Sequence, residues 1–69
     1  MPPQSVRAVM VDTLVRRARA GEQAAYRELA KRIRATAGIP RFASGSRRAL
    51  RRIGTPAALR LLAKLGLDD

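Results

Sequence analysis

Apolar side chains recur every three or four residues along this chain, the spacing that places them on one side of an α-helix. The pattern is clearest in the second such stretch, where Tyr26, Leu29 and Ile33 form one apolar stripe. Cationic side chains occupy the opposite side of the same stretch, as expected for a helix with one face in water. The repetition of this pattern predicts an all-α protein.

Glycines separate the apolar-periodic stretches, at positions where glycine readily takes the left-handed conformation that ends a helix. These glycines are Gly21, Gly38, Gly54 and Gly66. The expected helices span about residues 5–20, 22–37, 46–53 and 56–65. Because the loops between them are short, we expect antiparallel neighbours in a small bundle of two helical hairpins. The bundle forms one domain over residues 1–69, with residues 1–4 disordered.

Polar side chains mark where each helix is expected to begin. Thr55 followed by Pro56 is the strongest signal, because the hydroxyl can cap the helix and proline suits its first position. Ser5 is the expected cap of the first helix. Either Ser44 or Ser46 is expected to start the third.

The apolar faces of the four segments predict the hydrophobic core. Phe42 lies in the loop between the second and third helices, and we expect it to be buried there because an apolar ring gains by leaving water. The residues expected to form the core are Met10, Leu14, Tyr26, Leu29, Ile33, Leu50, Ile53, Leu59 and Leu62.

The net charge of the chain indicates the kind of partner that it binds. The chain has fifteen Lys or Arg residues against five Asp or Glu, a formal net charge of +10. Repulsion of this size disfavours a compact monomer, and a polyanion such as DNA or RNA relieves it. GC-rich coding is the alternative explanation, since thirteen residues are Arg and thirteen are Ala. With only one Tyr and one Phe, stacking on single strands is poorly supported, so duplex DNA or structured RNA is the better match.

Four arginines of the third helix form the first candidate site. Arg47, Arg48, Arg51 and Arg52 share one surface at spacings that place their guanidinium groups side by side, each able to hold a phosphate through two hydrogen bonds. Backbone N–H groups of the preceding Ser-Gly-Ser segment can add an anion contact. A solvated polar face is the alternative, but like charges four residues apart repel one another.

A second cationic stripe lies on the expected helix 22–37. Arg27, Lys31 and Arg34 follow one another at spacings of four and three residues. Here an ordinary helix surface is the stronger alternative, because Lys and Arg favour helices and Glu28 is expected to pair with Arg32 four residues on. Arg41, in the loop before the third helix, is expected to bridge the two patches.

Two segments resemble known families. Residues 11–29, VDTLVRRARAGEQAAYREL, resemble the opening of region 2 in extracytoplasmic-function sigma factors, where a similar pattern forms two helices that meet at the glycine. The aromatic promoter-melting part of that region has no counterpart in this chain. The resemblance implies a helix-Gly-helix hairpin and a connection with transcription.

The second resemblance covers residues 49–62, ALRRIGTPAALRLL, which look like a single HEAT-type helical hairpin. HEAT arrays need several stacked units to bury their faces. One such hairpin therefore implies local packing of two helices and not a solenoid.

A different class of function remains open, that of a protein-interaction module. Such a module could be an adaptor on the transcription machinery or an assembly factor with an acidic protein partner. The apolar sides of segments 5–20 and 56–65 also allow a homodimer. A membrane-active basic peptide is the least favoured alternative, because tryptophan is absent and the helix stop signals indicate folded hairpins.

Catalysis has little support in the sequence. There is no His or Cys, and the five carboxylates form no evident inward-facing pair. We therefore expect no enzymatic activity, no cofactor and no metal. No apolar run reaches the roughly 20 residues that span a bilayer, and the N-terminus does not read as a secretory signal. The expected location is the cytoplasm.

Overall fold

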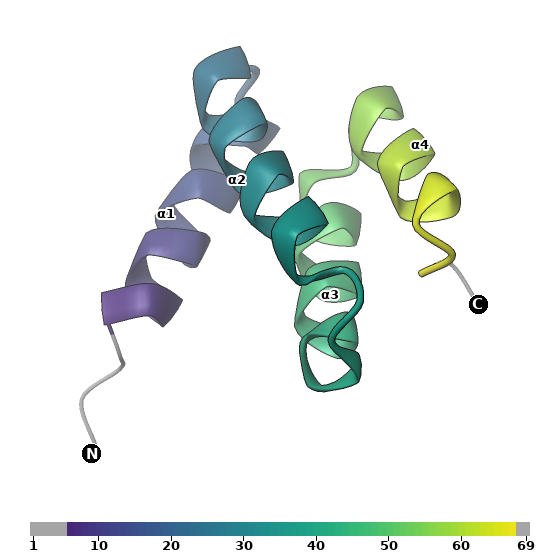
Figure 1. The fold of residues 1–69 in the computed structure, drawn as a ribbon. Coiled ribbons are helices and arrows are strands. Elements are labelled where there is room, and N and C mark those ends of the chain that lie inside the picture. Colours follow the sequence, from purple (N-terminus) through teal and green to yellow (C-terminus); the bar gives the residue numbers. More distant parts are fainter. Residues whose placement is uncertain (1–5, 68–69) are drawn as a thin grey trace.

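The computed structural model describes residues 6–67, and every regular element in that range is a helix (Figure 1). The elements are α1 (Val6–Arg19), α2 (Gln23–Thr36), the short 3-10 helix η1 (Pro40–Phe42), α3 (Ala43–Ile53) and α4 (Pro56–Lys64). The predicted all-α bundle of four helices is confirmed. The expected disorder of residues 1–4 and the expected cap at Ser5 lie outside the described residues.

The helices form two hairpins that meet through α1 and α3. Helix α1 packs against both α2 and α3, and α4 packs against α3. The turns use glycines with positive φ, +101° at Gly21 and +68° at Gly54, a conformation that glycine adopts without a Cβ clash. A hydrogen bond from the Tyr26 hydroxyl to the Ala57 carbonyl, 3.1 Å long, joins α2 to the start of α4.

The core gathers apolar side chains from all four α-helices. Leu29, Leu50 and Val15 are its largest fully buried members. Of the residues predicted for the core, five are buried: Leu29, Ile33, Leu50, Ile53 and Leu62. Leu14 and Tyr26 are half-buried and pack against this cluster. Leu67, beyond the end of α4, is also buried and closes the core at that end.

Two predicted core residues are on the surface. Met10 is 41% exposed and Leu59 is 47% exposed. Each lies about 90° to 100° around its helix from the centre of the buried side, given 100° per residue. Met10 also lies in the half of α1 that diverges from α2 (Figure 1). The apolar arc of these helices is therefore wider than the arc that neighbouring helices cover.

The start of the third helix differs from the prediction. Helix α3 begins at Ala43, because the 3-10 turn at Pro40–Phe42 runs directly into it and the Ala43 N–H bonds to the Pro40 carbonyl. Neither Ser44 nor Ser46 caps the helix, and both lie in its first turn. Phe42 is only half-buried, so the expected burial of its ring is also incomplete.

The start of α4 follows the sequence signal. The Thr55 side chain accepts a hydrogen bond from the Ala58 N–H at 3.3 Å, and Pro56 occupies the first turn. We expect Thr55→Ala to lower the free energy of unfolding by about 1 kcal/mol. Urea denaturation followed by circular dichroism measures the change. Thr55→Ser keeps the hydroxyl, so its free energy of unfolding should fall much less. An equal fall in the two variants would contradict a capping role.

Candidate nucleic-acid interface

The four predicted arginines of α3 share its outer surface. Ala49, Leu50 and Ile53 face the core, so positions 47, 48, 51 and 52 fall on the opposite side of the helix. Together with Ser44, the side chains of these arginines line a shallow surface depression of about 450 Å³. The structure thus brings together the residues that the sequence singled out first.

Two of these arginines are held by the rest of the fold. The Arg52 Nη2 lies 2.9 Å from the Asp12 Oδ1 of α1, and the Arg47 Nε donates a hydrogen bond to the Leu67 carbonyl at 2.5 Å. Asp12 also pairs with Arg16, at 3.0 Å. A carboxylate from another helix therefore offsets the cluster at Arg52, a contact that helical spacing within α3 does not predict.

The other two arginines form no ion pair within the described part of the chain. Arg48 and Arg51 are exposed, and neither lies within ion-pair distance of a carboxylate in residues 6–67. They stand between the two anchored arginines on the helix surface. Because anchoring restricts the side chains of Arg47 and Arg52, less rotamer entropy remains to be lost when this face binds a ligand. The result is a cluster with two anchored guanidinium groups and two exposed ones.

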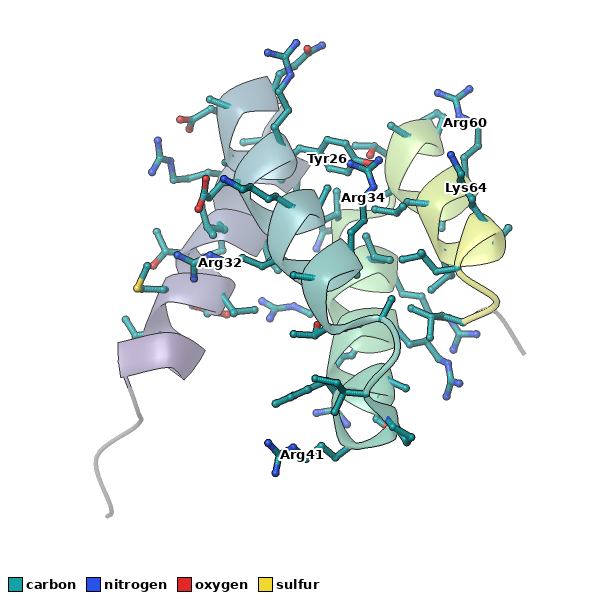
Figure 2. All side chains as sticks on the ribbon, in the orientation of Figure 1. Tyr26, Arg32, Arg34, Arg41, Arg60 and Lys64 are labelled. Atoms are coloured by element: carbon teal, nitrogen blue, oxygen red, sulfur yellow. The ribbon has the colours of Figure 1, made fainter. Side chains whose placement is uncertain are left out.

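The second predicted stripe lies apart from this cluster. Arg27, Lys31 and Arg34 are all exposed on α2, and none of them lines the depression beside α3. Arg34 is directed from α2 toward α4, on whose outer side Arg60 and Lys64 lie (Figure 2). The structure thus divides the cations into separate surfaces.

Arg41 joins one of these surfaces and does not bridge them. Its guanidinium carbon lies 4.9 Å from the centre of the Phe42 ring, and it shares a groove with Arg48 and Arg52 of α3. None of the α2 stripe residues lines that groove. Arg41 therefore lies with the α3 cluster, and Figure 2 places it far from Arg34 of the α2 stripe.

Two further arginines at this groove were not among the predicted site residues. Arg16 of α1 and Arg32 of α2 both line it. In the sequence each has a carboxylate four residues before it, Asp12 and Glu28, which reads as an ordinary surface ion pair. The predicted pair of Glu28 with Arg32 is confirmed at 3.4 Å. Only tertiary packing brings these arginines to a common edge.

Every carboxylate in residues 9–67 has an arginine partner. Asp12 pairs with two arginines, while Glu28 and Glu22 pair with one each. Ten of the fourteen Lys and Arg residues in this range have no such partner. The positive potential of the surface is therefore left largely uncompensated.

The pair between Arg17 and Glu22 closes the turn from α1 to α2. The Arg17 Nε donates to the Glu22 carboxylate at 2.8 Å, and its Nη2 contacts the other oxygen. This hydrogen bonding and the arginine charge lower the pKa of Glu22. They also raise the pKa of Arg17. Glu22 thus acts through its ion pair, because its side chain does not cap α2.

This pair predicts a small acid sensitivity. A carboxyl group with a lowered pKa in the folded state stabilises the fold above its ordinary pKa of 4.5 and loses that contribution as the pH falls through the lower folded value. We expect the midpoint of thermal unfolding to fall less between about pH 5 and pH 3 in Glu22→Gln than in the unmodified protein. Arg17→Gln should behave alike. If the midpoint falls by the same amount in both variants as in the unmodified protein, the contribution of the pair is contradicted.

Comparison with known proteins adds no family to this description. The chain matches no protein-family model, no curated protein and no solved structure. Within residues 6–67, none of the helices combines the length and apolar character needed to cross a bilayer. No group of three metal-ligating side chains comes together in that range. The candidate site therefore rests on its own geometry and charge.

Proposed function

We propose that this protein binds the phosphate backbone of duplex DNA or structured RNA through the outer face of α3. The observation that carries the proposal is the arginine cluster of that helix, in which Arg48 and Arg51 are exposed between the anchored Arg47 and Arg52 and pair with no carboxylate of residues 6–67. Guanidinium groups bind phosphate oxygens through paired hydrogen bonds, which are among the strongest polar contacts in proteins.

A solvated surface explains this arrangement less well. Arg47 and Arg51 are four residues apart on one helix, as are Arg48 and Arg52, and such like-charge pairs destabilise a helix by a few tenths of a kcal/mol each. Asp12 offsets only one of the four. A polyanion converts the remaining repulsion into binding energy, because phosphate contacts release condensed counterions.

The aromatic side chains favour a duplex or a structured RNA over a single strand. The Tyr26 hydroxyl is bonded to the Ala57 carbonyl, which holds the half-buried ring between α2 and α4. The Phe42 ring is covered on one side by the Arg41 guanidinium. Binding of single strands relies on exposed rings that stack on bases, and these two rings are poorly placed for that purpose.

The proposal is tested by measuring affinity at several salt concentrations. Fluorescence anisotropy with a labelled 20-base-pair duplex and with an RNA hairpin gives the equilibrium constants. If four to six phosphates are contacted, log K should fall with log salt at a slope of roughly −4 to −5. Affinity that is independent of salt, or no binding at low salt, would contradict the proposal. A polyglutamate probe of equal charge distinguishes phosphate contacts from general attraction to anions.

Removing the carboxylate that pairs with Arg52 of the cluster should strengthen binding. Asp12 holds both Arg16 and Arg52, so Asp12→Asn releases two cations and deletes a negative charge. We expect several-fold tighter binding to the duplex and a salt slope steeper by about 1. The same anisotropy titration measures both. Glu28→Gln, which frees Arg32 on α2, is the matched control and should change the affinity less; weaker binding by Asp12→Asn would contradict the arrangement.

A further inference from the structure

A groove lined by both apolar and cationic side chains lies between α1, the second half of α2 and the η1–α3 segment. Its volume is about 1160 Å³. Pockets for small ligands usually measure about 300 to 1,000 Å³, so the groove is large for a metabolite. Its place corresponds to the side on which α1 and α2 diverge (Figure 1).

Apolar side chains from all three segments line the groove, and we refer to them as its floor. Met10 and Val11 come from α1, Ile33 from α2 and Phe42 from η1. Met10 is substantially exposed, although its spacing places it with the apolar residues of α1. The floor thus offers adaptable and aromatic side chains of the kinds that are enriched at protein interfaces.

Arginines also line the groove, and we refer to them as its rim. Among the described residues that line the groove, Asp12 is the only carboxylate, and it is already paired with two arginines. The arginines at the groove are Arg16, Arg32, Arg41, Arg48 and Arg52. Three of them already pair with Asp12 or Glu28, whereas Arg41 and Arg48 pair with no carboxylate of the described residues. An occupant must therefore combine an apolar face that fits the floor with acidic side chains that meet the rim. Those two requirements together describe an amphipathic acidic helix.

The charge of the chain decides whether a second copy of the chain or an acidic partner is the better occupant of the groove. A second copy also carries a net charge of +10, so seating one copy on the rim of another places like charges together, which costs free energy. A helix of opposite charge gains from the same rim and is steered toward it during encounter. The surface therefore discriminates in favour of an acidic partner.

We propose that this groove docks an amphipathic acidic helix of a partner protein, with apolar residues at positions i, i+3 or i+4 and i+7 on the floor and Asp or Glu side chains on the arginine rim. This proposal goes beyond phosphate binding by α3, because it depends on the floor residues Met10 and Phe42, which a phosphate backbone does not need. The two activities share Arg48 and Arg52.

The experiment uses a fluorescein-labelled 18-residue peptide with Leu at the apolar helical positions and Glu beside them. A scrambled peptide of identical composition removes the amphipathic pattern and keeps the charge. Fluorescence anisotropy at about 0.15 M salt should give at least tenfold tighter binding for the amphipathic peptide. Amide chemical shifts in a ¹⁵N-labelled sample should change at the groove. Equal affinity for the two peptides would overturn the proposal, since attraction would then reflect net charge alone.

Variants locate the binding to the groove. Met10→Glu should weaken binding of the amphipathic peptide at least tenfold, and Leu59→Glu, an equally exposed apolar residue on α4 outside the groove, should change it less than about threefold. For the rim, Arg41→Glu should likewise weaken binding, and Arg60→Glu on α4, outside the groove, is its control. Equal losses within each pair would overturn the proposal. So would sedimentation showing a dimer that Met10→Glu dissociates, because a second copy would then occupy the groove.

Discussion

Binding to duplex DNA is expected to weaken by on the order of a hundredfold when Arg48→Glu and Arg51→Glu are combined. Each substitution removes one charge-assisted contact with phosphate, about 1.5 kcal/mol or more per contact, and adds repulsion. The slope of log K against log salt should become shallower by about 2. Because both side chains are exposed and pair with no carboxylate in the described part of the chain, the fold should be retained. Anisotropy titrations measure the affinity and its salt dependence, and circular dichroism checks that the fold is retained.

The matched control reverses the same amount of charge on α2. Arg27→Glu combined with Lys31→Glu also changes two exposed cations, but these lie outside the depression lined by α3. If the α3 face makes the contacts, this control should weaken binding less than about tenfold, through the long-range potential alone. Equal losses for the two double variants would mean that net charge, and not the α3 cluster, governs binding.

Leu50→Ala is expected to have the largest effect on stability. Leu50 is fully buried in α3 among the core residues, and truncating such a side chain costs about 2–5 kcal/mol through lost burial and the cavity left behind. A chain of 69 residues has a total stability of roughly 3–10 kcal/mol. We therefore expect a large fraction of the variant to be unfolded at 37 °C, as measured by chemical denaturation at several temperatures.

Leu59→Ala provides the comparison. Both leucines belong to the core predicted from the sequence, but Leu59 is 47% exposed. Its truncation should change the free energy of unfolding by no more than about 0.5 kcal/mol. Similar losses at Leu50 and Leu59 would show that α4 packs with a different face toward α3.

The helical architecture could be predicted from the sequence because the signals that specify it are local. Gly21, Gly54 and the Thr55-Pro56 pair specify where helices end and begin through backbone conformation and side-chain capping. The start of α3 was less accessible, since the continuation of η1 into α3 produces no strong local signal. Met10 and Leu59 were misassigned because the width of the buried side depends on which neighbouring helices cover it, and periodicity contains no information on that point.

The candidate site, like the fold, could be predicted where its signals are local and not where it depends on tertiary packing. Helical periodicity alone placed Arg47, Arg48, Arg51 and Arg52 on one surface. The anchoring of Arg52 joins residues 40 positions apart, and that of Arg47 joins residues 20 apart, so neither contact follows from local spacing. The groove likewise depends on the angle between α1 and α2. Local pattern thus specified the cluster, while tertiary packing determined which of its members remain unpaired.

Mapping the bound surface by NMR tests the central claim most directly. A ¹⁵N-labelled sample titrated with a 20-base-pair duplex reports both the backbone amides and the arginine Nε–H groups. The proposed arrangement predicts that the largest shifts occur along the outer face of α3, at Arg47, Arg48, Arg51 and Arg52, and that they reverse when salt is raised. Shifts concentrated on α2 or α4, with those four residues unchanged, would contradict it.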